Sequence, residues 1–437
     1  MTCRILAIFF VLLAVSTCAI AGGPLLVGGP NFGVDGVPFV WDNTRTIQYR
    51  TDGGNLGSLS NAAANSLVTA AFSAWTSIPT VSLTVQRIGP LQGIADVVTI
   101  ADYNSLEGSV SSGAQTAVVY DASGALFHAL FSDPNIIGFA GPRKLSATGK
   151  IVTGIAAING QAGGSDLLKT TMVHEFGHLL GLDHTQVNCR ALGCLDADNA
   201  NIPTMFPILF DARQAVPKAD DRAWISNLYP SSRFTTNYGT IKGRVLFSDG
   251  TSPVQDAVVI ARQVGVSPAA VTDQSAAVAV SSISGYRFTG NPGQPYSADY
   301  LRCTAVSPQC PTGYYFANTE GDLPGSRNPE LIGSYEIPVP PGMYTLEVRT
   351  IGNGYTSNDM GPLFPSIPLP GPEEFWNLNE SATDSTFEDV GFDVLTTVLD
   401  TVTVVAGATT SSVDFILNGT PPTSDDFDSG PLAGGAR

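Results

Sequence analysis

The segment from residue 174 to 184 reads HEFGHLLGLDH, and it constrains the fold of this chain more than any other feature. Its first two histidines, His174 and His178, stand four residues apart, so on an α-helix they project from one face about one turn apart. Gly181 can take a left-handed conformation that ends the helix, which turns the chain back and brings His184 to the same point. The pattern predicts a helix, a sharp reversal and three imidazoles around one metal ion.

Three neutral imidazoles are typical of a catalytic zinc site, because they leave a fourth tetrahedral position open for water. Zinc lowers the pKa of that water towards about 7, and Glu175 lies close enough to take its proton as a general base. A lone HExxH on an amphipathic helix is a common accident. The five fixed positions of HExxHxxGxxH, however, arise by chance in roughly one chain in ten thousand of this length. The chain has only 4 histidines, and most of them stand in this motif.

The N-terminus has the features of a secretory signal peptide. Arg4 precedes an unbroken apolar run at residues 5–15, and the small residues at 19–21 fit cleavage after Ala21. A membrane anchor is the alternative, but the run is about half of the roughly 20 residues that span a bilayer. Lipidation of Cys18 is another. We therefore expect a secreted, extracellular protein without stable membrane insertion.

Export changes the meaning of the cysteines. The four that would remain are Cys189, Cys194, Cys303 and Cys310, an even number in an oxidising compartment. They fall in two close pairs, so we expect two local disulfides, each closing a small loop. Metal ligation is the alternative, but the two pairs stand in different predicted domains.

The composition limits the class of protein. With 21 basic against 38 acidic residues the net charge is -17, which disfavours binding to nucleic acid or to anionic membranes. Hydrophobic residues make up 43%, enough for packed cores, and 437 residues predict two folded units. Nothing in the sequence indicates the oligomeric state.

We place the boundary between the two units near residue 232, after a turn-rich stretch. The predicted domains are a signal peptide at 1–21, a catalytic domain at 22–232, a β domain at 233–419 and an acidic, disordered tail at 420–437. Helical patterns of the catalytic domain lie at 60–75, 165–180 and 220–228, and strand patterns at 46–49, 81–87 and 96–100.

Beyond residue 232 short strand patterns predominate, which predicts an all-β sandwich. They lie at 240–247, 257–264, 335–339, 344–349, 398–405 and 412–417. Two stretches rich in Gly, Pro, Ser and Asn, at about 265–332 and 352–390, are expected to be long loop insertions.

The motif HEFGHLLGLDH resembles the zinc signature of the metzincin peptidases. That group adds a Met-turn, a methionine in a tight turn beneath the metal, and Met205 within residues 202–207 fits it. Over about residues 39–230 the chain is most similar to the matrixins. The resemblance implies an α+β fold, with a twisted mixed sheet and three helices, and zinc endopeptidase activity on extracellular proteins or peptides.

The chain also departs from that family. Animal matrixins hold a second, structural zinc through several upstream histidines, but only His128 precedes the motif here. Residues 136–142 look like the family's edge strand, with Phe139 where a ligand histidine would stand. We expect His128 to be an ordinary half-buried residue. Calcium is possible at 120–124 or 196–199, although Asp and Asn are also good turn residues.

The β region resembles a carboxypeptidase regulatory-like, transthyretin-type sandwich through residues 240–245, 254–259 and 333–346. Such modules are normally non-catalytic, so we expect residues 22–232 to suffice for the chemistry. The leading function is thus a secreted zinc endopeptidase with Glu175 as its base. The alternative is a catalytically impaired adhesion or carbohydrate-binding protein built on a metzincin domain, against which the intact Glu175 argues. The physiological substrate is not indicated.

Overall fold

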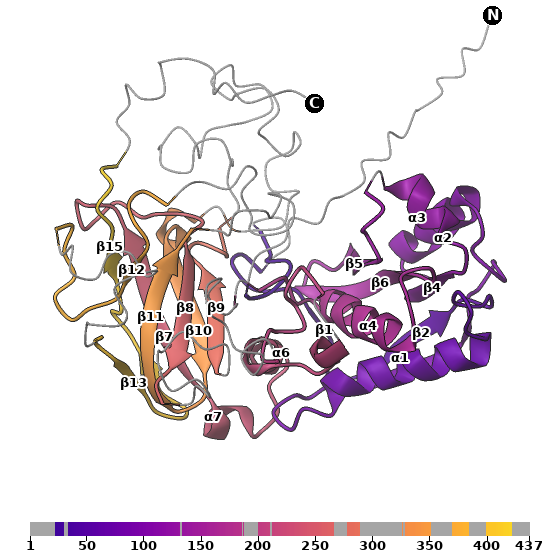
Figure 1. Ribbon diagram of the computed structural model, residues 1–437, viewed down its shortest axis with the longest axis horizontal. Helices are drawn as coiled ribbons and strands as arrows, with labels where there is room; N and C mark the ends of the chain where they lie inside the picture. Colours follow the sequence, from indigo (N-terminus) through magenta and orange to yellow (C-terminus); the bar gives the residue numbers. More distant parts are fainter. Residues whose placement is uncertain are drawn as a thin grey trace, which may run out of the picture.

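The computed structural model describes residues 22–29, 34–131, 133–185, 187, 200–209, 212–265, 278–288, 326, 328–350, 369–383 and 399–421. The cysteines, the signal peptide, the calcium candidate at 196–199 and most of the acidic tail lie outside these ranges. The predictions made for them therefore stay predictions. Figure 1 shows the chain as two adjoining halves, one with helices packed on a sheet and one built from strands.

The first half is a mixed sheet with helices. Its strands are β1 (Val40–Trp41), β2 (Ile47–Thr51), β3 (Val85–Pro90), β4 (Ala117–Asp121), β5 (Gly138–Leu145) and β6 (Lys150–Asn159). Its helices are α1 (Asn61–Thr76), α2 (Ile100–Ser112), α3 (Ala125–Leu130), α4 (Ser165–Leu179), the short η2 (Ala212–Ala215) and α6 (Ala219–Leu228). The strands follow the order β1-β6-β4-β2-β3, all in parallel pairs, and β5 alone pairs antiparallel, with β6.

The helix that carries the motif packs on α1. Ser60 caps α1 by accepting from the amide of Ala63. The buried stripe of α1 includes Phe72, whose ring stacks on Phe176 of α4 with 4.0 Å between centroids. Helix α1 lies where its apolar periodicity predicts it, because that periodicity is the stripe that it buries, whereas α4 is buried on all faces from Thr170 to Leu179.

Two α-helices of the first half, α2 and α3, were not expected from the sequence. Residues 96–100, predicted as a strand, lead instead into α2, where Thr99 and Asp102 form a capping box. The strand prediction is wrong because this reciprocal cap fixes a helix start. With α2 and α3, the first half contains more helices than the three that the sequence resemblance implies.

The second half consists of two sheets after the short helix α7 (Phe234–Asn237). Its strands are β7 (Gly239–Leu246), β8 (Val258–Gln263), β9 (Ala279–Ile283), β10 (Ser334–Val339), β11 (Gly342–Arg349), β12 (Glu374–Phe375), β13 (Val402–Val404), β14 (Thr409–Thr410) and β15 (Phe415–Ile416), with a short 3-10 helix η4 (Pro329–Leu331) before β10. One sheet has the order β10-β7-β14 with β15 also on β7, and the other β12-β11-β8-β9 with β13 also on β11.

Strand β9 falls in a stretch that was expected to be loop. All five of its residues are buried, so its sequence shows no alternation of polar and apolar positions. The loop prediction is wrong for this segment because alternation appears only where one face of a strand meets water.

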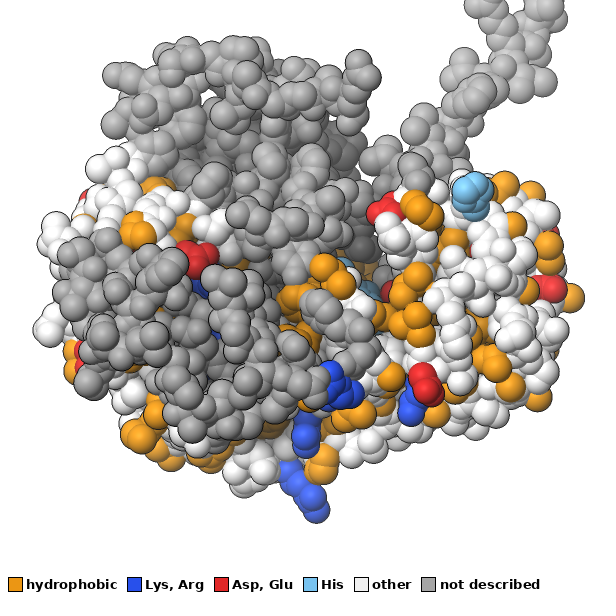
Figure 2. All heavy atoms as spheres, viewed as in Figure 1, with side chains coloured by type: hydrophobic (Ala, Val, Ile, Leu, Met, Phe, Trp, Pro, Cys, Tyr) orange, Lys and Arg blue, Asp and Glu red, His pale blue; other side chains and the backbone are white. Residues whose placement is uncertain are grey.

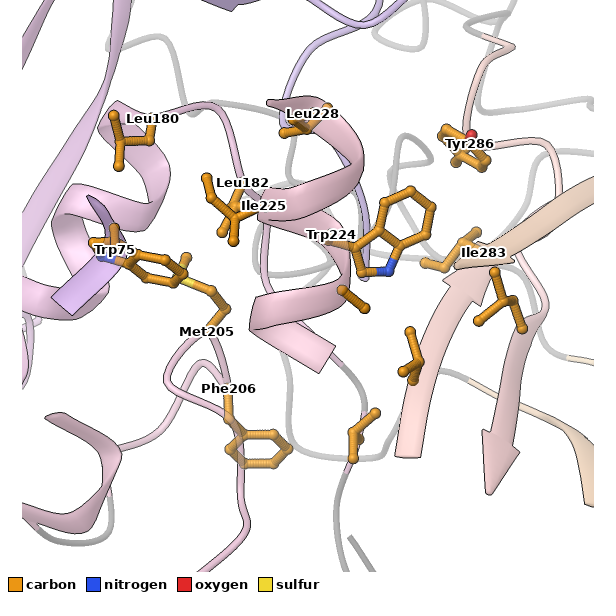
Figure 3. Close-up of a cluster of buried hydrophobic side chains, with 14 of the residues drawn as sticks. Trp75, Leu180, Leu182, Met205, Phe206, Trp224, Ile225, Leu228, Ile283 and Tyr286 are labelled. Atoms are coloured by element: carbon orange, nitrogen blue, oxygen red, sulfur yellow. The ribbon is translucent and has the colours of Figure 1, made fainter. Parts of the chain in front are cut away.

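The two halves share one hydrophobic cluster (Figure 3). Trp224 of α6 lies with Met205 and Ile225 on one side and Ile283 and Tyr286 on the other. Its ring meets Tyr286 edge-on, with 5.9 Å between centroids. The apolar core thus crosses the predicted boundary near residue 232, which itself stays a prediction. No helix in the described ranges is both long and apolar enough to cross a membrane.

Candidate metal centre

The three histidines of the motif meet at one point. Nε2 of His184 lies 3.2 Å from Nε2 of His174 and 3.1 Å from Nε2 of His178. Nitrogens bound to one tetrahedral zinc at about 2.0–2.1 Å lie about 3.3 Å from each other, so these separations suit a shared ion. Within the described residues this is the one group of three or more His, Cys, Asp or Glu side chains that could hold a metal.

Backbone carbonyls fix the other ring nitrogen of both helical ligands. Nδ1 of His174 donates to the carbonyl of Thr204 (2.7 Å), and Nδ1 of His178 donates to that of Leu182 (2.9 Å). Because a carbonyl can only accept, the proton of each neutral ring sits on Nδ1 and leaves a lone pair on Nε2.

Burial keeps both of these rings neutral. Burial first, and then the nearby imidazole of His184, lowers the pKa of His174 to about 3. The same two causes, followed by His174, hold the pKa of His178 well below its usual range. Neutral imidazole is the form that binds a metal, so this electrostatic setting favours a cation between the rings.

Gly181 makes the reversal that brings in the third histidine. Its φ is +92°, in the left-handed region that glycine adopts without strain. The amide of Leu182 then donates back to the carbonyl of Gly177 (2.9 Å), which closes the end of the helix. The chain leaves α4 sideways, and His184 faces the two helical ligands as the sequence predicts.

Met205 lies beneath the metal-binding side of α4. It is buried, and a Cβ added to Gly177 would overlap its sulfur, so helix and methionine are in close contact. The carboxylate of Asp221 on α6 accepts from the amides of Thr204 (2.8 Å) and Met205 (2.9 Å). This acid thereby holds the turn whose carbonyl orients His174. Sequence reasoning gave it no such role, because an acidic residue at the start of a helix is expected there in any case.

Glu175 faces strand β5. A Cβ added to Gly138, the first residue of that strand, would come within 2.5 Å of Oε1 of Glu175. The carboxyl is buried, and burial raises its pKa to about 8. In Figure 2 histidine atoms are visible in a hollow near the middle of the molecule, with hydrophobic side chains beside it. The carboxyl, the edge strand and the histidines thus occupy one part of the molecule.

The position expected for a further ligand histidine is instead part of an aromatic cluster. Phe139 lies 5.9 Å from Tyr103, 5.5 Å from Phe127 and 5.4 Å from Phe131, measured between ring centroids. His128 on α3 is exposed rather than half-buried, and it is not part of the metal cluster. At the position of Phe139, packing of aromatic rings thus takes the place of a metal ligand.

In residues 120–124, where the sequence would allow calcium, the acidic residue forms hydrogen bonds with the backbone of the protein instead. The carboxylate of Asp121 is buried and accepts from the amide of Phe127 (2.9 Å) on α3, while its carbonyl accepts from Gly160 (2.8 Å). Among the described residues no metal-ligand cluster forms at this turn. Turn and helix capping account for the acidic residue.

Comparison with known proteins adds little. No family model and no curated protein matches the chain. Among solved structures, a crystal structure of metalloproteinase-II from Bacteroides fragilis shares 15% identity at a TM-score of 0.23, over 44% of this chain and 56% of that one. A structure of a chaperone-substrate complex shares 15% identity at a TM-score of 0.22, over 43% of this chain and 36% of that one. The alignments span only part of either protein, and likenesses this weak assign no family.

Proposed function

We propose that this chain is a secreted zinc-dependent endopeptidase that hydrolyses peptide bonds of extracellular proteins. The observation that carries the proposal is the convergence of three Nε2 atoms, on His174, His178 and His184, next to the buried Glu175. Zinc is the ion that best suits three imidazoles with one open position, since calcium and magnesium prefer oxygen donors. Met205 then serves as the supporting methionine of a Met-turn, in keeping with the matrixin-like sequence.

Glu175 performs the proton transfers in this proposal. When bound, zinc supplies a Lewis acid for the peptide carbonyl and makes a water molecule in the site more acidic. Glu175 takes a proton from the attacking water and later passes it to the departing amine. The raised pKa of Glu175 applies to the site before a metal ion is bound, and its cause is burial. A nearby divalent ion favours the ionised form, which is the one that accepts a proton.

The edge of β5 is the proposed binding surface for the substrate backbone. Strand β5 pairs with β6, and no strand of the described residues pairs with its other edge. An extended peptide can add to such an edge through main-chain hydrogen bonds. Because Gly138 of β5 lies against Glu175, a peptide held there passes the general base.

The proposal is tested by measuring zinc content and casein cleavage of the purified full-length protein. We expect activity that a chelator removes and added zinc restores. His178→Ala should abolish both zinc retention and cleavage, whereas His128→Ala, which changes an exposed histidine outside the cluster, should retain both. Zinc binding without cleavage of casein or of a peptide library would favour the adhesion or carbohydrate-binding alternative.

A further inference from the structure

A single residue of the second half is bonded to three residues of the first. Ser281, in the middle of β9, is fully buried, and its amide donates to Oδ1 of Asp220 (2.7 Å). Its hydroxyl donates to the same oxygen (3.2 Å) and lies 3.0 Å from the hydroxyl of Thr185. Its carbonyl accepts from Nε1 of Trp224 (2.8 Å). The amide, the hydroxyl and the carbonyl of Ser281 are thus all hydrogen-bonded to residues of the first half.

One of these contacts lies beside the third metal ligand. Thr185 directly follows His184, the one histidine of the cluster that no helix holds. The amide of Thr185 donates to the carbonyl of Met205 (2.9 Å), and its hydroxyl meets Ser281 from the other side. The loop is therefore fixed between the methionine turn and strand β9.

The N-terminal part of the described chain closes the same corner. The amide of Gly22 donates to the carbonyl of His184, and a Cβ on Gly22 would overlap the backbone of Ser281. Three segments far apart in the sequence, around residues 22, 184 and 281, are thus in mutual contact. Because these segments are closely packed, a shift of β9 would also displace the loop that carries His184.

We infer that Ser281 is a positioning residue for the metal centre, acting through Thr185 on the orientation of His184. This inference rests on the proposed metal site. It also changes the role of the second half of the chain, which we had expected to be dispensable for chemistry. Groups that orient metal ligands without touching the ion commonly change metal affinity by about tenfold to a hundredfold.

The test is the affinity of the full-length protein for Co²⁺, measured by competition with a chromogenic chelator. Ser281→Ala removes the hydroxyl but keeps both backbone bonds, and we expect it to raise the Co²⁺ dissociation constant about tenfold. Ser282→Ala is a matched control, since Ser282 is the next residue of β9, equally buried, and its hydroxyl has no hydrogen-bond partner among the described residues. It should bind Co²⁺ like the wild type.

Thr185 provides an independent arm if Ser281→Ala does not fold. Thr185→Val removes the contact with Ser281 together with the bond that the hydroxyl accepts from the amide of Val187 (3.1 Å). Thr185→Ser retains a hydroxyl for both and should restore the affinity. The contact between the two hydroxyls is lost in both single variants, so the loss of affinity in the double variant should be smaller than the sum of the two single losses.

The absorption spectrum of bound Co²⁺ separates positioning from simple loss of stability. We expect altered ligand-field bands in Ser281→Ala, which a variant that is only less stable would not show. Equal affinities and identical spectra of the wild type, Ser281→Ala and Thr185→Val would overturn this inference while leaving the metal site intact. A wild-type protein that binds no Co²⁺ would overturn both.

Discussion

The thioether of Met205 lies against the Cα of Gly177, the residue just before His178 on α4. A Cβ on this glycine would overlap the sulfur and come within 3.0 Å of the ring of Trp75. The metal-binding helix can therefore approach the methionine turn only because residue 177 has no side chain. Since the carbonyl of Thr204 in that turn orients His174, the contact reaches the metal centre in two steps.

Gly177→Ala should therefore weaken both the fold and the metal site. We expect the added methyl group to cost about 1–3 kcal/mol of unfolding free energy, because it overpacks a buried contact. Urea unfolding and Co²⁺ affinity would measure the two effects. The matched control is Gly108→Ala on α2, where a Cβ would lie within 4 Å of no described residue outside the adjoining backbone of its own helix. It should instead stabilise the protein by about 0.5–1 kcal/mol. A Gly177→Ala protein as stable as the wild type would show that the contact is looser than described.

Glu175→Gln should separate metal binding from catalysis. The amide keeps the size of the side chain but cannot accept the proton, so turnover should fall by about a hundredfold or more. Zinc content, measured by atomic absorption on the same sample, should stay at about one ion per chain. Glu330→Gln, an exposed change far along the sequence, serves as control. Wild-type turnover in Glu175→Gln would exclude the mechanism.

Gly138→Ala should impair catalysis without removing the metal. The new methyl group would come within 2.5 Å of Oε1 of Glu175 and would push the carboxyl from its place. We expect a lower kcat with unchanged zinc content, and peptide kinetics would report it. If kcat and KM both match the wild type, Glu175 tolerates displacement and the edge strand does not constrain it.

Asp220 should make the stability of the protein depend on pH. Burial, and then the neighbouring Asp221, raises the pKa of Asp220 from 3.8 to about 7. In the unfolded chain the carboxyl ionises near pH 4. Its contribution to stability is thus fully present below about pH 4 and is lost as the pH rises through about 7.

Asp220→Asn cannot ionise, so its unfolding free energy should fall less than that of the wild type between about pH 4 and 7. Urea unfolding with a chelator present would measure this, since the chelator removes the pH dependence of metal binding from the comparison. Parallel curves for the two proteins would contradict the raised pKa.

The metal cluster could be predicted from sequence because its geometry is local. His174 and His178 are set by helical spacing, and His184 by a glycine three residues after the second histidine. The supporting groups could not be predicted in this way. Ser281 lies about a hundred residues beyond the motif in a stretch without strand periodicity, and only tertiary packing brings it near Thr185.

Helix α2 was missed for a different reason. Its buried residues, Tyr103, Leu106 and Val110, have helical spacing, but they are separated by polar and small residues that weaken the pattern. The capping box of Thr99 and Asp102 was the stronger signal, because a reciprocal cap fixes a helix start even where periodicity is faint.

The buried position of Trp224 has a consequence for a chain that has been cut. Its indole is hydrogen-bonded to Ser281 and packs on Tyr286, so the second half covers it with apolar and polar contacts at once. A protease nick near the exposed residues Ser232 and Arg233 would therefore leave two fragments that stay associated under native conditions. They would elute together in gel filtration, and only a denaturant would separate them.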